Sequence, residues 1–218
     1  MRSARAMTPL ARLLASPSAR VLLGFLAGLM LLGAAAPWLP MPDPAGINLG
    51  EKLASCSLAH PFGTDHLGRD LLSRLIWGIR TTLWLSLAAM AATAAAGILA
   101  GSIAGFCGGR IDAAIMRLCD VMLSFPSEVL ILAIVGLTGP SGGHVVLACV
   151  IAKWAWAARM TRSIVRRHAG SGFVQFARAS GAGGPALLLQ HVLPAAAGEL
   201  FVLMTVEAGD IVLLISTL

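Results

Sequence analysis

Residues 82–106 read TLWLSLAAMAATAAAGILAGSIAGF, a run without a single charged side chain. About 20 mostly apolar residues suffice for a helix to cross the hydrocarbon core of a bilayer, so this stretch alone predicts a membrane span. Four further stretches approach the same apolarity: 21–39, 119–137, 144–158 and 200–218. We therefore expect an all-α fold, a polytopic membrane helical bundle with five visible spans.

The composition agrees with a chain that is mostly in contact with lipid. Hydrophobic residues make up 57% of the chain and charged residues 12%, and the mean hydropathy is +0.84. The net charge is +6, but no basic patch is interleaved with aromatic residues as nucleic-acid binding requires, so we expect no nucleic-acid partner. Four scattered cysteines contain no CxxC pair and indicate neither a zinc site nor a disulfide framework. Three of them, Cys107, Cys119 and Cys149, are interpreted as small helix-packing residues.

The distribution of Lys and Arg predicts the orientation, because positively charged loops stay in the cytoplasm. The N-terminal segment before the first run carries Arg2, Arg5, Arg12 and Arg20 and no acidic residue, whereas residues 41–80 balance four basic against four acidic residues. The predicted organisation is a cytoplasmic N-terminus and first span (1–40), an external segment (41–81) and a core domain (82–218) with a cytoplasmic loop at 159–198. An alternative for the first run is a secretory signal peptide, since basic residues precede it and it ends in Ala34–Ala36.

Within that loop, residues 170–199 read GSGFVQFARASGAGGPALLLQHVLPAAAGE, which Gly and Pro interrupt too often for a span. The pattern predicts two short helices on the inner surface. Ser171 would cap the first, which runs through Ala179, and Pro185 would begin the second, which would end before Pro194. Taken alone, the residue types fit an interfacial amphipathic hairpin equally well.

The external segment contains HPFGTDHLGRDLLSRLIWGIRTTLWLSL at residues 60–87. Thr64 or Asp65 is suited to cap a helix here, with Arg69, Arg74 and Arg80 lying along the membrane surface. The alternative is a charged, solvated turn.

Both stretches resemble motifs of the ABC importer permeases that carry dipeptides, oligopeptides and nickel, and specifically their second permease subunit. The loop is similar to the EAA motif of that family, with Gln in place of the usual Glu and Phe in place of the usual Ala. The residues at the motif positions are Gln175, Phe176, Ala177, Gly181, Leu193 and Pro194. The external signature of the family is matched by Gly63, Thr64, Asp65, Gly68, Arg69 and Asp70. Residues 108–130 and 153–163 match in the same order, so the resemblance covers most of residues 60–195.

The resemblance implies a transport subunit of the bacterial cytoplasmic membrane and not an enzyme. Its EAA-like loop would dock on a cytoplasmic ATPase subunit, so ATP would be used by two partner ATPases and no cofactor would be bound by this chain. A second permease subunit and an extracytoplasmic substrate-binding protein would complete the assembly. Members of the family have six spans, so we expect this chain to be C-terminally truncated and to lack the last one.

Two carboxylates in the last apolar run point to the cargo. Glu207 and Asp210 are three residues apart, on one helix face, and ionisable groups inside a membrane usually mark a pathway. They would form a cation relay or be satisfied by polar neighbours. Residues 63–70 and Trp154–Trp156 look closer to the nickel-type permeases, which favours nickel or a chelated transition metal over di- or oligopeptides. An inactive truncated permease or a passive membrane anchor remains an alternative, and no metal ligands are assigned.

Overall fold

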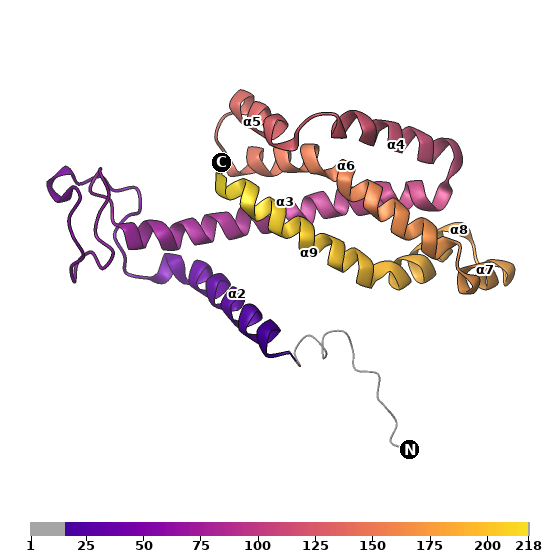
Figure 1. Cartoon of the computed structure of the whole chain (residues 1–218), viewed down its shortest axis with the longest axis horizontal. Helices are drawn as coiled ribbons and strands as arrows, with labels where there is room; N and C mark the ends of the chain where they lie inside the picture. The colour runs from indigo at the N-terminus through magenta and orange to yellow at the C-terminus, as the bar shows by residue number, and fades with distance from the viewer. Residues whose placement is uncertain (1–15, 218) are drawn as a thin grey trace, which may run out of the picture. The chain divides into compact units, whose positions relative to one another are not determined.

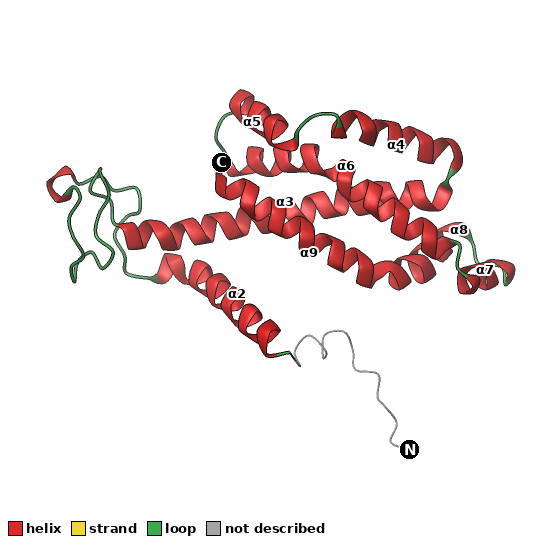
Figure 2. Ribbon diagram, viewed as in Figure 1, coloured by secondary structure: helices red, strands yellow, loops and turns green. Residues whose placement is uncertain are grey.

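The computed structural model describes residues 16–217, and these form helices joined by turns, with one isolated β-bridge between Thr64 and Asp70 (Figures 1 and 2). The described residues divide after Leu83 into two compact units. The all-α fold class predicted from the apolar runs is confirmed.

The first unit contains the helix α2 (Pro17–Ala35), which a short 3-10 turn extends to Trp38, and a second 3-10 turn at Leu49–Glu51. Helix α3 (Leu71–Cys107) begins in this unit and continues into the second. The chain between the 3-10 turn and α3 has no long element and is held together by the loop contacts described below.

The second unit contains the rest of α3 and the helices that follow it. α6 is central, because it packs against α4, α5 and α9. In Figure 1, α5 and the C-terminal end of α9 lie at one end of this unit, and α7 with α8 at the other. The elements are α4 (Gly109–Leu123), α5 (Ser127–Thr138), α6 (Gly142–Ala169), α7 (Gly172–Ala179), α8 (Gly184–Ala186), the π-helical segment η3 (Leu187–Val192) and α9 (Leu193–Thr217).

Three described helical stretches are long and apolar enough to cross a membrane, namely Pro17–Trp38, Leu71–Cys107 and Gly184–Thr217. These stretches overlap the first, second and fifth predicted spans, which are therefore helical where the structure describes them. α3 has 37 residues, and at 1.5 Å per residue it is about 55 Å long, well beyond a hydrocarbon core of about 30 Å. Part of α3 therefore extends out of the hydrocarbon region or the helix is tilted.

The third predicted span, 119–137, is wrong as a single helix. α4 and α5 meet at a bend of 79°, and Pro126 precedes α5 at the break. Proline has no N–H to donate and disfavours helical backbone at the residue before it, so the helix stops at Leu123. The fourth prediction, 144–158, lies inside the longer α6, which is not among the membrane-capable helices because Lys153 and Arg159 lower its apolarity.

The predicted end of the second loop helix before Pro194 is also wrong. α8, η3 and α9 follow one another without a break, as a single helical stretch from Gly184 to Thr217. A proline inside an α-helix loses one hydrogen bond, and its ring clashes with the carbonyl four residues earlier. The π-helical turn at Leu187–Val192 widens the helix directly before Pro194, which lets the helix continue.

α3 and α6 approach closely along three glycines spaced four residues apart. A Cβ on Gly97 would collide with Ala157, one on Gly101 with the Ala158 carbonyl oxygen, and one on Gly105 would lie 2.7 Å from the Arg162 carbonyl oxygen. Small residues at this spacing allow helix backbones to pack in direct contact, as is common between membrane helices. The GxxxGxxxG pattern is visible in the sequence and fixes α6 against α3.

The cysteine interpretation is confirmed for two of three positions. Cys119 and Cys149 are buried, in contact with the apolar clusters around α6, whereas Cys107 is exposed at the end of α3. Cys107 is therefore not a packing residue.

Candidate functional site

The external signature, residues 63–70, forms a compact turn directly before α3. Gly63 and Gly68 both have φ +74°, a backbone conformation that glycine adopts without strain. A Cβ on Gly68 would overlap the Asn48 carbonyl. The Thr64 hydroxyl donates to the Glu51 carbonyl and accepts from the Ala54 N–H at 2.8 Å. This segment is therefore a folded structure and not a loose, solvated turn.

Asp65 organises the turn. Its Oδ1 accepts the N–H groups of Leu67 (2.8 Å) and Arg69 (3.0 Å), and its Oδ2 accepts from the Arg69 Nε at 2.8 Å and from Arg74. Burial alone would raise the pKa of Asp65, but these backbone and guanidinium donors outweigh it and lower the pKa well below the usual range. Arg69 and Arg74 thus bind Asp65, and Arg69 precedes α3, which corrects its predicted place on the helix.

The helix cap in this segment is Asp70 and not Thr64 or Asp65. α3 begins at Leu71, and Asp70 Oδ2 accepts the Ser73 N–H at 2.7 Å. The other oxygen of Asp70 lies 3.0 Å from His60 Nδ1, and His60 Nε2 lies 3.4 Å from Glu51. The hydrogen bond to Asp70 raises the pKa of His60, burial acts in the opposite direction, and the nearby Glu51 raises it further.

The EAA-like loop begins with α7, which follows Ser171 as predicted and ends at Ala179. Ser171 does not cap the helix through its side chain, because its hydroxyl donates to the His168 carbonyl instead. Gln175 and Phe176 are exposed, and Phe176 retains 75% of its accessible surface. Ala177 is half-buried and packs against the loop core formed by Val165, Val174, Leu187 and Val192.

The second part of the loop is the start of the last long helix. Gly181 has φ +92°, which reverses the chain between α7 and α8. Leu193 packs against the loop core, and Pro194 is exposed. Glu199, one turn further, pairs with Arg167 and lies 3.1 Å from His168 Nε2. The loop is therefore tied to the C-terminal end of α6 by both apolar and ionic contacts.

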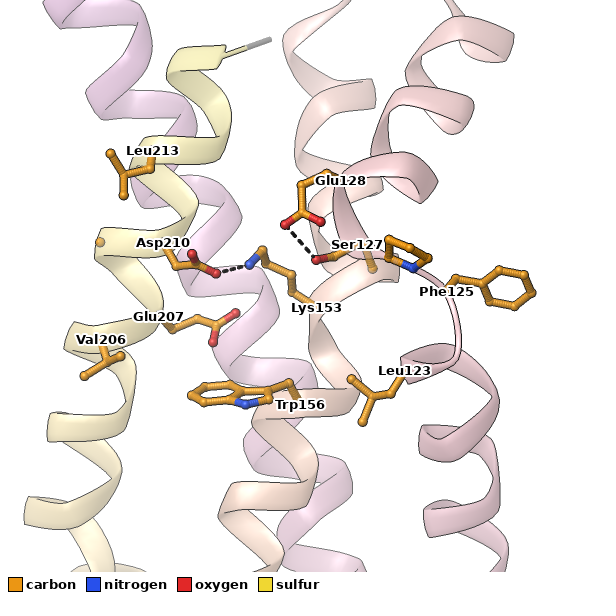
Figure 3. Close-up of a pocket in the computed structure, with 13 residues that line it drawn as sticks. Leu123, Phe125, Ser127, Glu128, Lys153, Trp156, Val206, Glu207, Asp210 and Leu213 are labelled. Atoms are coloured by element: carbon orange, nitrogen blue, oxygen red, sulfur yellow. Dashed lines mark hydrogen bonds and ion pairs between the residues drawn. The ribbon is translucent and has the colours of Figure 1, made fainter.

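A pocket of about 620 Å³ lies among the residues between α4 and α5, on α6 and on α9 (Figure 3). Glu207 and Asp210 both line it, so the prediction that they share one helix face is confirmed. Apolar side chains form much of the remaining lining, with Trp156 at one side. Glu207 is buried in this setting, and a charged group that is shielded from water interacts more strongly with a ligand.

Lys153 is the residue that the sequence reasoning did not assign to this site. It projects from α6 into the pocket and pairs with Asp210. The Lys153 side chain is 8% exposed and that of Asp210 is 62% exposed, so the pair reaches from the interior of the unit to its surface. A basic residue in the middle of a predicted span was the signal that could have identified it.

Glu207 is buried, at 4% exposure, and its Oε1 has no hydrogen-bond partner among the residues that the structure describes. Glu128 also lines the pocket, where it accepts a hydrogen bond from the Ser127 hydroxyl at 3.2 Å. One lysine and three carboxylates thus surround this pocket. Within residues 16–217, no group of three or more His, Cys, Asp or Glu side chains is arranged to hold a metal ion.

Comparison with known proteins identifies the family. Residues 97–218 match the model of the family described as "Binding-protein-dependent transport system inner membrane component". The chain is 37% identical over 196 residues to the nickel transport system permease protein NikC of Escherichia coli K12, covering 90% of this chain and 71% of that protein. It is 36% identical over 210 residues to the metal-staphylopine import system permease protein CntC of Staphylococcus aureus Mu50, covering 96% and 73%.

A third relative is named for a different cargo, a dipeptide. The probable D,D-dipeptide transport system permease protein DdpC of Escherichia coli K12 is 36% identical over 193 residues, which cover 87% of this chain and 64% of that protein. The matched family segment holds the α3–α6 glycine contact, the pocket and the EAA-like loop. This chain therefore belongs to the family of binding-protein-dependent transport system inner membrane components, as a multi-pass permease subunit of an ABC importer.

Proposed function

We propose that this chain forms half of the translocation pathway through which nickel, or a chelated transition metal, enters the bacterial cytoplasm. The observation that carries the proposal is the pocket on α6 and α9, where Glu207, Asp210 and Glu128 supply carboxylates for a cationic cargo. Two relatives with metal cargo in their names, NikC and CntC, support it. A second permease subunit would supply the facing half, because substrate paths of transporters run between membrane bundles.

The EAA-like loop is proposed to couple this pathway to two cytoplasmic ATPase subunits. Phe176 projects from α7 next to the exposed Gln175, and the loop core holds that helix firmly against α6. An exposed aromatic side chain on a well-anchored helix suits an anchor in a partner groove. An extracytoplasmic binding protein would deliver the cargo to residues 41–81, and the N-terminus would be cytoplasmic.

The second candidate is import of di- or oligopeptides. Lys153 favours it, because a lysine in the pocket can pair with a peptide carboxylate. The relative DdpC, with a dipeptide in its name, supports the same reading. A passive membrane anchor without ATPases is a third candidate, which would leave the exposed face of α7 without a role.

The deciding experiment is uptake of radioactive nickel and of a radioactive dipeptide by cells that lack their own importers for both. The complete operon is supplied with this subunit either present or deleted. Nickel uptake that depends on the subunit supports the metal proposal, and dipeptide uptake alone replaces it with the second candidate. A variant with Glu207→Gln and Asp210→Asn that reaches the membrane at the parent level should reduce nickel uptake, and unchanged nickel uptake would contradict a role of these carboxylates in the pathway.

A further inference from the structure

The pocket is lined by charged side chains of both signs. Lys153 carries a positive charge into it, and Glu207, Asp210 and Glu128 carry carboxylates. Lys153 can attract a negative group of a cargo, and the three carboxylates can attract a positive one. A ligand that carries a carboxylate next to a positive centre is attracted by both groups.

The Lys153–Asp210 pair can exchange partners. The Asp210 side chain is 62% exposed, whereas the Lys153 side chain is 8% exposed. Asp210 can therefore turn away from the pair with little rearrangement, while Lys153 stays inside the pocket. If a ligand carboxylate replaces Asp210 as the partner of Lys153, then Asp210 becomes available for the positive centre of the same ligand. The buried charge of Lys153 is then never left unpaired, which would be strongly unfavourable.

Glu207 supplies the second contact. It is almost fully buried, lines the pocket and has an oxygen without a hydrogen-bond partner in the described part of the chain. Buried polar atoms are normally satisfied, so this oxygen is a place where a donor or cation of a ligand gains a strong interaction. The volume of about 620 Å³ is in the range of small-molecule sites.

We propose that Lys153, Glu207 and Asp210 form a binding site for an amino-carboxylate group. Lys153 binds the carboxylate, and Glu207 and Asp210 bind the positive centre beside it. That centre is a metal ion chelated by an amino acid, or the protonated amine of a peptide. The site rests on the proposed function in one respect, namely that cargo passes this face of α6 and α9.

The test compares matched cargoes that differ in one carboxylate. Cells with the complete operon are given radioactive nickel with excess histidine, or with histamine, which has the same amine and imidazole but no carboxylate. Glycyl-leucine and its C-terminal amide are the matched peptides. Wild type should take up the carboxylate cargo about tenfold or more faster, because a charge-assisted hydrogen bond contributes on that order. Equal uptake of both members of each pair overturns the proposal without any variant.

The variants assign the preference to this chain, since the binding protein is the same in every strain. Lys153→Met should abolish most of the preference by slowing the carboxylate cargo, and Lys153→Arg should retain it. If Lys153→Met fails to accumulate in the membrane, Lys153→Met combined with Asp210→Asn removes both members of the pair and is tested in its place. An unchanged preference in either variant, or equal slowing of both cargoes, overturns the proposal. If wild type imports no form of nickel, the nickel function fails and the peptide pair still tests the site.

Discussion

At the scale of single residues, His60 makes the stability of the turn at residues 63–70, directly before α3, depend on pH. Its partner Asp70 also caps α3 through the Ser73 N–H. The hydrogen bond to Asp70 raises the pKa of His60 above its ordinary value of 6.5. A raised folded-state pKa means that the stabilisation is fully present below pH 6.5 and is lost as the pH rises through the folded value. We expect weaker hydrogen-exchange protection of the first turn of α3 at pH 8.5 than at pH 6, after correction for intrinsic exchange rates.

The matched control for this prediction is His60→Gln, which keeps a hydrogen-bond donor and removes the titration. This variant should show the same corrected protection at both values of pH. Glu51→Gln removes the second acidic neighbour of the imidazole. This variant should lose its protection at a lower pH than the parent does. A parent protein whose corrected protection does not change with pH would rule out the linkage.

The sequence predicted which residues matter in the turn at residues 63–70 better than it predicted the role of each one. The motif residues Asp65 and Asp70 were identified, but the sequence could not tell that Asp65 binds two arginines while Asp70 caps the helix. Both are short acidic residues near a helix start, and only the turn geometry at Gly68 separates their roles. Lys153 could not be assigned to the pocket from the sequence, because its partner Asp210 is 57 residues away.

At the scale of elements, the contact between α3 and α6 predicts opposite effects of the same substitution. Gly→Ala inside a helix normally stabilises by about 0.5–1 kcal/mol. Gly78→Ala on α3 should follow this rule, since nothing lies within 4 Å of its added Cβ. Gly101→Ala places its Cβ against the backbone of α6 and should destabilise by about 1–3 kcal/mol, because backbone cannot rotate away.

Thermal unfolding of the two variants in detergent measures this contrast. Gly101→Ala should lower the midpoint of unfolding relative to the parent, and Gly78→Ala should leave it unchanged or raise it. If both variants shift the midpoint in the same direction, the glycines are not the contact that holds α6 against α3.

The turn between α7 and α8 gives a second prediction for an element. Gly181 has φ +92° and nothing within 4 Å of an added Cβ, so backbone strain alone penalises a side chain there, by about 1–3 kcal/mol. Gly181→Ala should weaken transport and association of the ATPase, and Gly181→Pro should abolish both, because proline fixes φ near −65°. Gly183→Ala is the matched control, since Gly183 has a negative φ and open space.

Uptake assays and co-purification of the ATPase from the same membranes measure the effect, with membrane levels of each variant as the reference. Gly183→Ala should match the parent in both assays. If Gly181→Pro is inserted normally and still retains the ATPase, the loop is not the coupling element.

The prolines at positions 126 and 194 show why two helix ends were predicted wrongly from the sequence. Proline is a breaker at position 126, where α4 and α5 bend by 79°, yet the helix continues through position 194. Local sequence shows the missing donor in both cases, but not the π-helical turn that accommodates Pro194. Long apolar runs predicted their helices correctly because burial in lipid requires every backbone group to be hydrogen-bonded within its own segment.

At the scale of the whole molecule, α6 joins the pocket to the loop. Ion pairs connect α6 to α9 at both levels, Lys153 with Asp210 beside the pocket and Arg167 with Glu199 beside the loop. Arg162 binds Asp112 of α4 through two nitrogen atoms. α6 and α9 therefore line the candidate binding site, and α6 also packs against α7, which carries the candidate coupling surface. A shift of the loop cannot leave the pocket unchanged if these pairs hold.

The orientation of the chain across the membrane can be tested with its own cysteines. Cys56 and Cys107 are exposed, and Cys119 and Cys149 are buried. The charge distribution predicts that residues 41–81 lie outside and the C-terminal end of α3 inside. In right-side-out spheroplasts, a membrane-impermeant maleimide should therefore label Cys56 and not Cys107, and permeabilisation should add Cys107. Cys56→Ser should remove the first signal and Cys107→Ser the second. Labelling of Cys107 alone in sealed spheroplasts would show that the orientation is the reverse. The EAA-like loop would then lie outside, where no ATPase could bind it.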